Sequence, residues 1–271
     1  MTKLLRLLSF ATASFFLLSG VAHADRLDDI KKAGVLRVGV FDSNPPFGSV
    51  DTGAKTIVGY DVDFARLIAK RLGVKLELTA TNPANRIPLL TSGKVDLIVA
   101  AMTITDDRAK VVDFSTPYFV TGQQFLSKKG VLTSEGQLAT LRVGAVKGTT
   151  EEATVRDRYP QASVVAYDDI PLAFTALRNG NVQTITQDGA ILAGLLGNVP
   201  DKANYEIAPF RITTEKYGIA VPKGETNLLK VVDATLVSSE QNGQAKQIFN
   251  RWFGPGSPSP LSRDFTITAS N

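Results

Sequence analysis

The sequence predicts an α/β protein of two lobes, in which each lobe is a mostly parallel sheet flanked by helices and two hinge strands join the lobes. Strand and helix signals alternate along the first half of the chain, and the alternation restarts in the second half. Two extended segments of similar pattern, residues 118–129 and 216–222, are interpreted as the paired hinge strands. Lobe 1 is therefore expected to contain residues 25–122 and 215–271, and lobe 2 residues 123–214.

The N-terminus has the pattern of a secretory signal peptide. Lys3 and Arg6 precede an apolar stretch, and residues 22–24 (AHA) are typical of a cleavage site. No later stretch approaches the roughly 20 apolar residues that a membrane span requires. The mature chain is therefore expected to begin near Asp25, after cleavage behind Ala24, and to be a free periplasmic protein. Because no Cys follows the cleavage site, a lipid anchor is not expected.

The composition excludes several kinds of chemistry. The chain has no Cys, and its single His, His23, falls within the signal peptide. Disulfides, Cys nucleophiles, Ser-His-Asp triads and His-based metal sites are therefore not expected, and neither is a cofactor or metal. Without Lys3 and Arg6, the 30 basic residues become 28 against 26 acidic ones. A balance of this size predicts no binding to nucleic acid or to anionic membranes, and a monomer is the default expectation.

The first lobe is predicted from alternating strand and helix patterns. Residues 60–72 carry apolar side chains at helical spacing and are followed by Gly73, which is typical of a helix end. The continuous apolar run of residues 95–104 is typical of a strand buried on both faces. In chain order, the sequence predicts a strand at 35–40, a helix at 60–72, a strand at 75–79, a short helix at 87–93 and a strand at 95–104.

The second lobe repeats this order, and the chain then returns to lobe 1. Two C-terminal helices are expected at 225–239 and 243–253, and the tail from residue 254, which is rich in Pro and Ser, is expected to be irregular and to wrap the surface. For lobe 2 the sequence predicts strands at 142–146, 163–167 and 182–187 and helices at 149–159, 170–180 and 189–197.

The segment TITDDR, residues 103–108, follows the apolar run and begins a helix. Thr105 is a good N-cap, and Asp106 and Asp107 suit the positive end of the helix dipole. Arg108 stands at the third helical position, where a capping box would have Glu. A cation at this place indicates an anion that it must hold. The alternative is a solvated Arg paired with Asp106 or Asp107.

Two strand ends of lobe 2 carry comparable signals. In VKGTTEE, Gly148 permits a tight turn, Thr149 and Glu152 fit a capping box, and the free N–H groups of the first turn form a small anion site. In TITQDGA, Asp188 ends an apolar strand just before a helix. Capping alone would explain the first segment, and Asp188 is either a helix N-cap or the partner of a ligand cation.

These three strand ends together indicate one kind of ligand. Ligands of open α/β sheets bind outside the carboxyl ends of the strands. An Arg fork and backbone N–H groups suit a carboxylate, and an Asp suits an ammonium group. The combination matches the α-carboxylate and α-ammonium of an amino acid held between two lobes.

The sequence resembles the periplasmic amino-acid-binding proteins of the polar amino-acid ABC transporter family (solute-binding protein family 3), which have the two-lobed type II periplasmic binding protein fold. The block that ends in TITDDR and continues to DFSTPYF is very specific to that family. The matching segments span nearly the whole mature chain: GVLRVGV with PPF, VGYDVDFARLIAKRLG, NRIPLLTSGKVDLIVAAMTITDDRAKVVDFSTPYF, VGAVKGTTEE, QDGAILAGLL and YGIAVPKG.

The resemblance implies a set of ligand-binding residues. Arg108 would bind the ligand α-carboxylate together with Thr103 and Thr150. The backbone at Ala101 would help to hold the α-ammonium, and Asp188 would pair with it. Binding would close the hinge, and the closed form would pass its cargo to a membrane ABC permease without any catalysis.

The resemblance also bears on the ligand side chain. The segment NRIPLL resembles the glutamate/aspartate-binding branch, in which the Arg matching Arg86 meets the side-chain carboxylate, so glutamate or aspartate is the expected ligand. Phe41 departs from this pattern, because some acidic-ligand relatives have a basic residue there and basic-ligand relatives an Asp. Asp168 or Asp169 would repel an acidic ligand if either pointed inward.

Three alternatives remain open at the level of the sequence. Phe41 would suit a neutral polar amino acid such as glutamine. The same fold hosts dehydratases of cyclic carboxylates, in which Asp188 would have to serve as general acid. A sensory binding protein that reports its ligand to a receptor would look the same.

Overall fold

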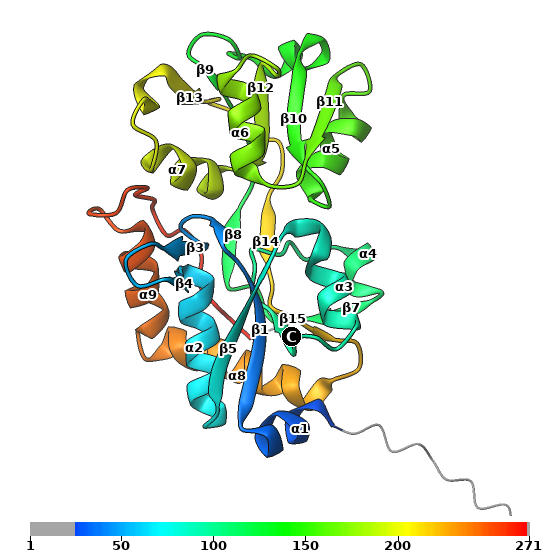
Figure 1. The fold of residues 1–271 in the computed structure, drawn as a ribbon, viewed down its shortest axis with the longest axis vertical. Coiled ribbons are helices and arrows are strands. Elements are labelled where there is room, and N and C mark those ends of the chain that lie inside the picture. The colour runs from blue at the N-terminus through cyan, green and yellow to red at the C-terminus, as the bar shows by residue number, and fades with distance from the viewer. Residues whose placement is uncertain (1–24, 270–271) are drawn as a thin grey trace, which may run out of the picture.

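The computed structural model describes residues 25–269, so the expected signal peptide at residues 1–24 lies outside the described part. Two lobes stand one above the other, and the short strands β8 (Phe119–Thr121) and β14 (Glu215–Tyr217) connect them (Figure 1). None of the helices between residues 25 and 269 has the length and apolar character of a membrane span. The expected fold class, two lobes of mostly parallel sheet flanked by helices, is confirmed.

Lobe 1 is built on a five-stranded sheet in the order β5-β1-β6-β15-β7. β1 pairs in parallel with β5 and β6, whereas β15 is antiparallel to β6 and β7. β1 can lie inside the sheet, between β5 and β6, because its side chains are buried on both faces from Val38 onward. The strands are β1 (Val35–Phe41), β5 (Lys75–Thr81), β6 (Leu97–Ile98), β7 (Val112–Phe114) and β15 (Ala220–Pro222).

The helices of lobe 1 cover this sheet. In α2 the apolar residues Phe64, Ala65 and Ile68 are fully buried, and Gly73 ends the helix in the left-handed conformation that glycine adopts without strain. The C-terminal helices α8 and α9 lie in this lobe, where α2 packs against both of them. The helices are α1 (Arg26–Ala33), α2 (Tyr60–Leu72), α3 (Arg86–Thr91), α4 (Asp106–Ala109), α8 (Thr226–Gln241) and α9 (Gln244–Phe253).

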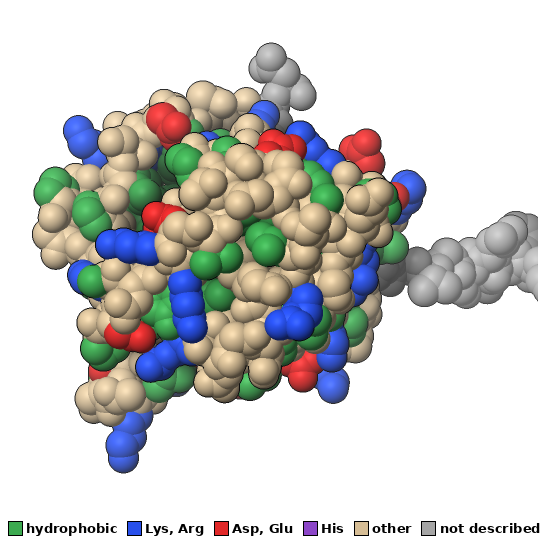
Figure 2. Space-filling model, turned by 90° about the horizontal axis from the view of Figure 1, so that it is seen from above, with side chains coloured by type: hydrophobic (Ala, Val, Ile, Leu, Met, Phe, Trp, Pro, Cys, Tyr) green, Lys and Arg blue, Asp and Glu red, His purple; other side chains and the backbone are tan. Residues whose placement is uncertain are grey.

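Lobe 2 has the same plan in the order β11-β10-β12-β9-β13. β10 is parallel to β11 and β12, and β9 is antiparallel to β12 and β13. Seen end on, this lobe has basic, acidic and apolar side chains interspersed on its surface (Figure 2). Its elements are β9 (Gln123–Lys128), β10 (Arg142–Val146), α5 (Thr150–Arg158), β11 (Ser163–Tyr167), α6 (Ile170–Arg178), β12 (Thr184–Asp188), α7 (Gly189–Gly197) and β13 (Tyr205–Ile207), with 3-10 turns at Glu135–Thr140 and Lys202–Asn204.

The hinge is a two-stranded antiparallel ribbon. β8 and β14 pair with Tyr217 opposite Phe119 and Glu215 opposite Thr121. After β8 the chain enters lobe 2 and forms β9, which is antiparallel to β12. After β14 it returns to lobe 1 and forms β15, which is antiparallel to β6. The crossing segments expected at 118–129 and 216–222 are therefore each divided between hinge and sheet. Phe119 anchors the ribbon in lobe 1, because its ring packs edge-on against that of Phe47, with the two ring centroids 4.9 Å apart.

The strand expected at residues 95–104 is only partly present. β6 covers Leu97 and Ile98, and the N–H of Val99 still donates to the Gly39 carbonyl. The backbone then turns at Ala101, whose φ is +40°, an unusual value for a residue other than glycine. This turn ends the strand because the Ala101 N–H is directed to the buried carboxylate of Asp61.

Several elements have no counterpart in the sequence analysis. The three-stranded ribbon of β2 (Ser43–Asn44), β3 (Gly48–Asp51) and β4 (Thr56–Val58) lies beside β1, and a 3-10 turn at Pro83–Asn85 precedes α3. The tail after α9 is irregular, as expected, but it is held in place. Arg263 forms an ion pair with Glu240, and the Thr116 hydroxyl donates to the Thr268 carbonyl.

Candidate ligand-binding cleft

A narrow cavity lies between the two lobes, close to the hinge. Its free space is about 10 Å³, which is about what a single water molecule needs. An amino acid can therefore enter only after the lobes move apart. All eight residues expected to bind ligand line the cavity: Phe41, Arg86, Ala101, Thr103 and Arg108 from lobe 1, and Thr149, Thr150 and Asp188 from lobe 2.

Arg108 reaches across the cleft. Thr105 caps α4 by accepting from the Arg108 N–H, which agrees with the expected N-cap. The guanidinium donates to the Thr103 carbonyl over 2.8 Å and to the Gly148 carbonyl of lobe 2 over 3.0 Å. The alternative of pairing with Asp106 or Asp107 is not realised: among residues 25–269 Arg108 forms no ion pair with either, and Asp107 pairs with Lys110. Burial lowers the pKa of Arg108, but the group stays cationic.

Arg86 lies deeper in lobe 1 and bonds mainly to backbone carbonyls. Its guanidinium donates to Pro83, Ala100 and Ala101 over 2.9 to 3.2 Å, and only 3% of the residue is exposed. The guanidinium carbon lies 5.4 Å from the ring centroid of Phe41, which gives Phe41 a stacking role. Burial lowers the pKa of Arg86 to about 9, and repulsion by Arg108 acts in the same direction.

A buried carboxylate organises the backbone beneath the two arginines. Asp61, on α2, accepts from the Ala101 N–H over 2.9 Å and from the Tyr118 hydroxyl over 2.7 Å. Because the Ala101 carbonyl accepts from Arg86, both backbone groups of Ala101 already have partners. Burial raises the pKa of Asp61 to about 7, although its two hydrogen bonds oppose the shift.

The wall from lobe 2 begins at the N-terminus of α5. Thr149 caps the helix by accepting from the Glu152 N–H, but the Glu152 carboxylate accepts from Gly148 rather than from Thr149, so the expected capping box is only half formed. The Thr149 hydroxyl also donates to Val146. Thr150 is the first residue of α5, and its hydroxyl lies 3.3 Å from Glu215, a residue of the hinge.

Asp188 ends β12 and faces the cavity. Asp188 is the N-cap residue of α7 by its backbone position, as one alternative expected, but its side chain accepts no N–H of the helix. One oxygen, Oδ2, accepts from the Tyr217 hydroxyl, and the other, Oδ1, is buried and has no hydrogen-bond partner among residues 25–269. Burial raises the pKa of Asp188 well above its usual range, and repulsion by Glu151 adds to this shift.

Sequence reasoning missed four lining residues: Pro83, Glu151, Gln187 and Ile191. Glu151 is the important omission, because the residue is 2% exposed and lines the same narrow cavity as Asp188. Its position directly after Thr150, inside a segment already assigned to the site, was the available signal. Asp168 and Asp169 do not line the cavity: Asp168 pairs with Lys147, and Asp169 caps α6. No cluster suited to a metal ion occurs among the described residues.

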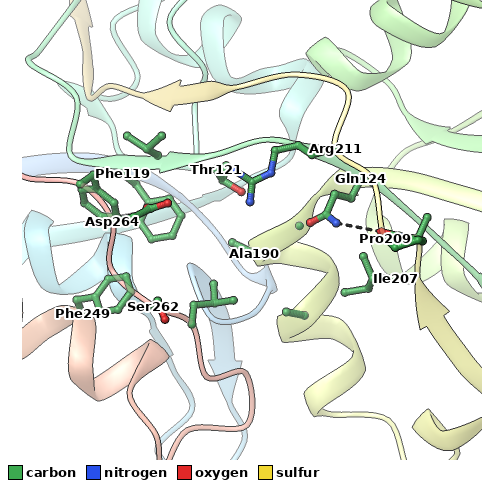
Figure 3. A pocket seen from close by; sticks show the side chains of 16 residues that line it. Phe119, Thr121, Gln124, Ala190, Ile207, Pro209, Arg211, Phe249, Ser262 and Asp264 are labelled. Atoms are coloured by element: carbon green, nitrogen blue, oxygen red, sulfur yellow. Dashed lines mark hydrogen bonds between the residues drawn. The ribbon is translucent and has the colours of Figure 1, made fainter. Parts of the chain in front are cut away.

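A second cavity, of about 340 Å³, opens on the other side of the start of α7. Gly189, Ala190 and Ala193 line it, whereas Asp188 and Ile191 of the same segment face the cleft. Figure 3 shows the hinge strand β8, the start of α7 and the C-terminal tail around it, with Arg211 extended beside Thr121 and Gln124 donating to the Ala208 carbonyl. Arg211 and Asp264 are both exposed here.

Comparison with known proteins decides the family. The profile of the bacterial extracellular solute-binding proteins, family 3, matches residues 36–255. This chain belongs to that family. It is 37% identical, over 84% of each chain, to the ABC transporter glutamine-binding protein of Bacillus subtilis. It is 30% identical, over 97% of this chain and 94% of the relative, to the glutamate/aspartate import solute-binding protein of Salmonella typhimurium.

A solved structure of the family supports the same conclusion. An ancestral arginine-binding protein bound to glutamine superposes with a TM-score of 0.78 at 38% identity, covering 82% of this chain and 98% of that one. The chain is thus an amino-acid-binding protein of an ABC transport system. The relatives differ in the amino acid that their names state, so family membership alone does not select the side chain.

Proposed function

We propose that this solute-binding protein captures an L-amino acid between its lobes in the periplasm and delivers it, as a monomer, to an ABC permease. The proposal is carried by one observation: the Arg108 guanidinium of lobe 1 and the Asp188 carboxyl of lobe 2 line the same cavity from opposite sides. The family profile describes extracellular proteins, and the N-terminal sequence pattern supports export.

The α-carboxylate would bind to Arg108. Within residues 25–269 this guanidinium forms no ion pair and donates only to backbone carbonyls. A ligand carboxylate is a stronger acceptor than the neutral Gly148 carbonyl, because it carries a negative charge and can accept two parallel bonds from the planar guanidinium. The hydroxyls of Thr103 and Thr150 would add donors from the two sides, and the first turn of α5 contributes backbone N–H groups.

The α-ammonium would bind to Asp188. Its Oδ1 atom is buried without a donor among the described residues, which is costly unless a cation or donor satisfies it. The Ala101 carbonyl would be a second acceptor, shared with Arg86.

The contacts of Arg86 favour a neutral polar side chain, such as that of glutamine, over glutamate or aspartate. Arg86 already donates to three carbonyls of its own lobe. Glu151 adds a carboxyl to the opposite wall, where it would repel an acidic side chain. An acidic ligand remains the second candidate, because Arg86 lines the cavity and has no carboxylate partner in the described part of the chain.

The decisive experiment is a thermal-shift screen of residues 25–271, unfolded and refolded to remove bound cargo, against the twenty amino acids. A ligand at 100 times its dissociation constant stabilises by about 2.7 kcal/mol, which gives a shift of several degrees. We expect the largest shift with glutamine. A shift confined to glutamate and aspartate would establish the acidic candidate. No shift with any amino acid would contradict the proposal and favour cyclic carboxylates as ligands.

A further inference from the structure

Glu151 and Asp188 form a pair of buried carboxyl groups in the cleft. Each residue is 2% exposed, and both line the same narrow cavity. Asp188 accepts from Tyr217 through Oδ2 only, and its buried Oδ1 has no donor among residues 25–269. The Glu151 carboxyl is the neighbouring group that could supply one, and it can do so only as a carboxylic acid.

Two carboxylates in this position could not both be charged. Burial disfavours the charge on each, and repulsion by Glu151 raises the pKa of Asp188 further. The surrounding charges relieve the pair only in part, because attraction by Arg108 lowers the pKa of Glu151 but does not outweigh its burial. Glu215, on β14, adds further repulsion, whereas Arg86 on α3 and Arg108 on α4 direct their donors to backbone carbonyls. One proton between the two carboxyls removes the repulsion and satisfies Oδ1 at the same time.

We propose that Glu151 and Asp188 share one proton in the ligand-free cleft and that the α-ammonium of the amino-acid ligand displaces this proton to solvent. The inference rests on the proposed function, because it uses the same cleft. The ammonium group arrives with its own positive charge and takes the place of the proton as the donor between the carboxyls. No covalent bond changes, and Glu151 becomes a second carboxylate for the ligand ammonium.

This exchange makes binding depend on pH. The complex holds one proton fewer than the free protein plus free ligand, so affinity increases with pH wherever the pair still holds its proton. For one released proton the dissociation constant should fall about tenfold for each unit of pH. If both carboxyls of the ligand-free cleft were already ionised, the dissociation constant would not change with pH in this way.

The test is isothermal titration calorimetry with L-glutamine at pH 7 in phosphate and in Tris, two buffers with very different ionisation heats. We expect a difference in heat that corresponds to release of about one proton per bound glutamine. Glu151→Gln should bind glutamine with no proton release, because an amide can donate to Asp188 permanently. Glu152→Gln, one residue further on α5 and paired with Arg156, should release the same proton as the wild type.

The remaining outcomes are also decisive. Equal heats in the two buffers for the wild type, or an unchanged release in Glu151→Gln, would overturn the inference while leaving the proposed function intact. If glutamine does not bind at all, the proposed ligand fails, and carbon-13 NMR of the side-chain carboxyls of the ligand-free protein decides the proton instead. One carboxyl of the pair must then stay protonated at pH 7 in the wild type, and Asp188 must become ionised in Glu151→Gln.

Discussion

The Arg108 guanidinium of lobe 1 donates a 3.0 Å hydrogen bond to the Gly148 carbonyl oxygen of lobe 2. Gly148 has a φ of +76°, and a Cβ at this position would lie 2.8 Å from the Cα of Ala84. Lobe 2 therefore approaches lobe 1 here as closely as a backbone without a side chain permits. A carboxylate held by Arg108 would lie where the two lobes meet, so its binding energy would favour closure.

Replacing Arg108 by Ala should abolish binding of every amino acid. The substitution removes the charged fork from a cleft that excludes water, which costs about 3 kcal/mol or more, or a factor of at least about 100 in the dissociation constant. Calorimetry with glutamine and glutamate measures the loss. Arg156→Ala is the matched control, because Arg156 pairs with Glu152 on the surface of lobe 2 and should leave both affinities unchanged. Full affinity in Arg108→Ala would remove this residue from the site.

Replacing Arg86 by Ala should weaken glutamine and glutamate by similar factors. Its main partners are the carbonyls of Ala100 and Ala101, which would lose their donor. We also expect the free energy of unfolding to fall by about 1 to 3 kcal/mol, because buried acceptors are left unsatisfied. Calorimetry and urea unfolding measure the two effects. A loss confined to glutamate, without loss of stability, would instead assign Arg86 to a side-chain carboxylate.

Replacing Gly194 by Ala should keep the cleft from closing. Gly194 lies on α7, and a Cβ there would come within 2.1 Å of the Pro45 carbonyl oxygen of lobe 1. Overpacking of this kind costs about 1 to 3 kcal/mol, which would weaken glutamine binding by roughly 5- to 100-fold. Small-angle scattering at saturating glutamine should show a larger radius of gyration. Gly136→Ala, at an exposed position with no atom within 4 Å, should change neither quantity.

Asp61 should make the protein less stable as the pH rises towards neutrality. Its pKa is about 7 in the folded protein, against 3.8 for an ordinary Asp, so the folded state binds more protons between these values. The contribution is complete below pH 4 and is lost as the pH rises to about 7, at up to about 1.4 kcal/mol per pH unit. Urea unfolding across this range should give a shallower slope for Asp61→Asn. Parallel slopes for the two proteins would show that Asp61 is already ionised.

Local signals predicted much of the fold. The helix Tyr60–Leu72 and its end at Gly73 follow from apolar spacing and from the conformational freedom of glycine, which are properties of a few neighbouring residues. The strand end at Ala101 could not be predicted in this way. Its cause is the Asp61 carboxylate, 40 residues earlier, whose attraction for the Ala101 N–H appears only in the folded chain.

The sequence also predicted some of the residues of the candidate cleft, but not all of them. Arg108 is conspicuous in the sequence because a cation is unusual in the first turn of a helix, and Asp188 because a carboxylate ends an apolar strand. Glu151 has no such mark, since an acidic residue is normal in the first turn of a helix. Its importance comes from Asp188, and only the packing of α5 against β12 brings these two carboxyls together.

The chain crosses the hinge twice, and this affects the order in which the two sheets can be completed during synthesis. All five strands of the lobe 2 sheet lie between residues 123 and 207, so this sheet can assemble once that stretch has been synthesised. In lobe 1, β15 joins β6 to β7, and it comes only at residues 220–222. Lobe 1 therefore begins first but is completed last. The edge of β6 stays uncovered during translation, when it is most open to pairing with another chain.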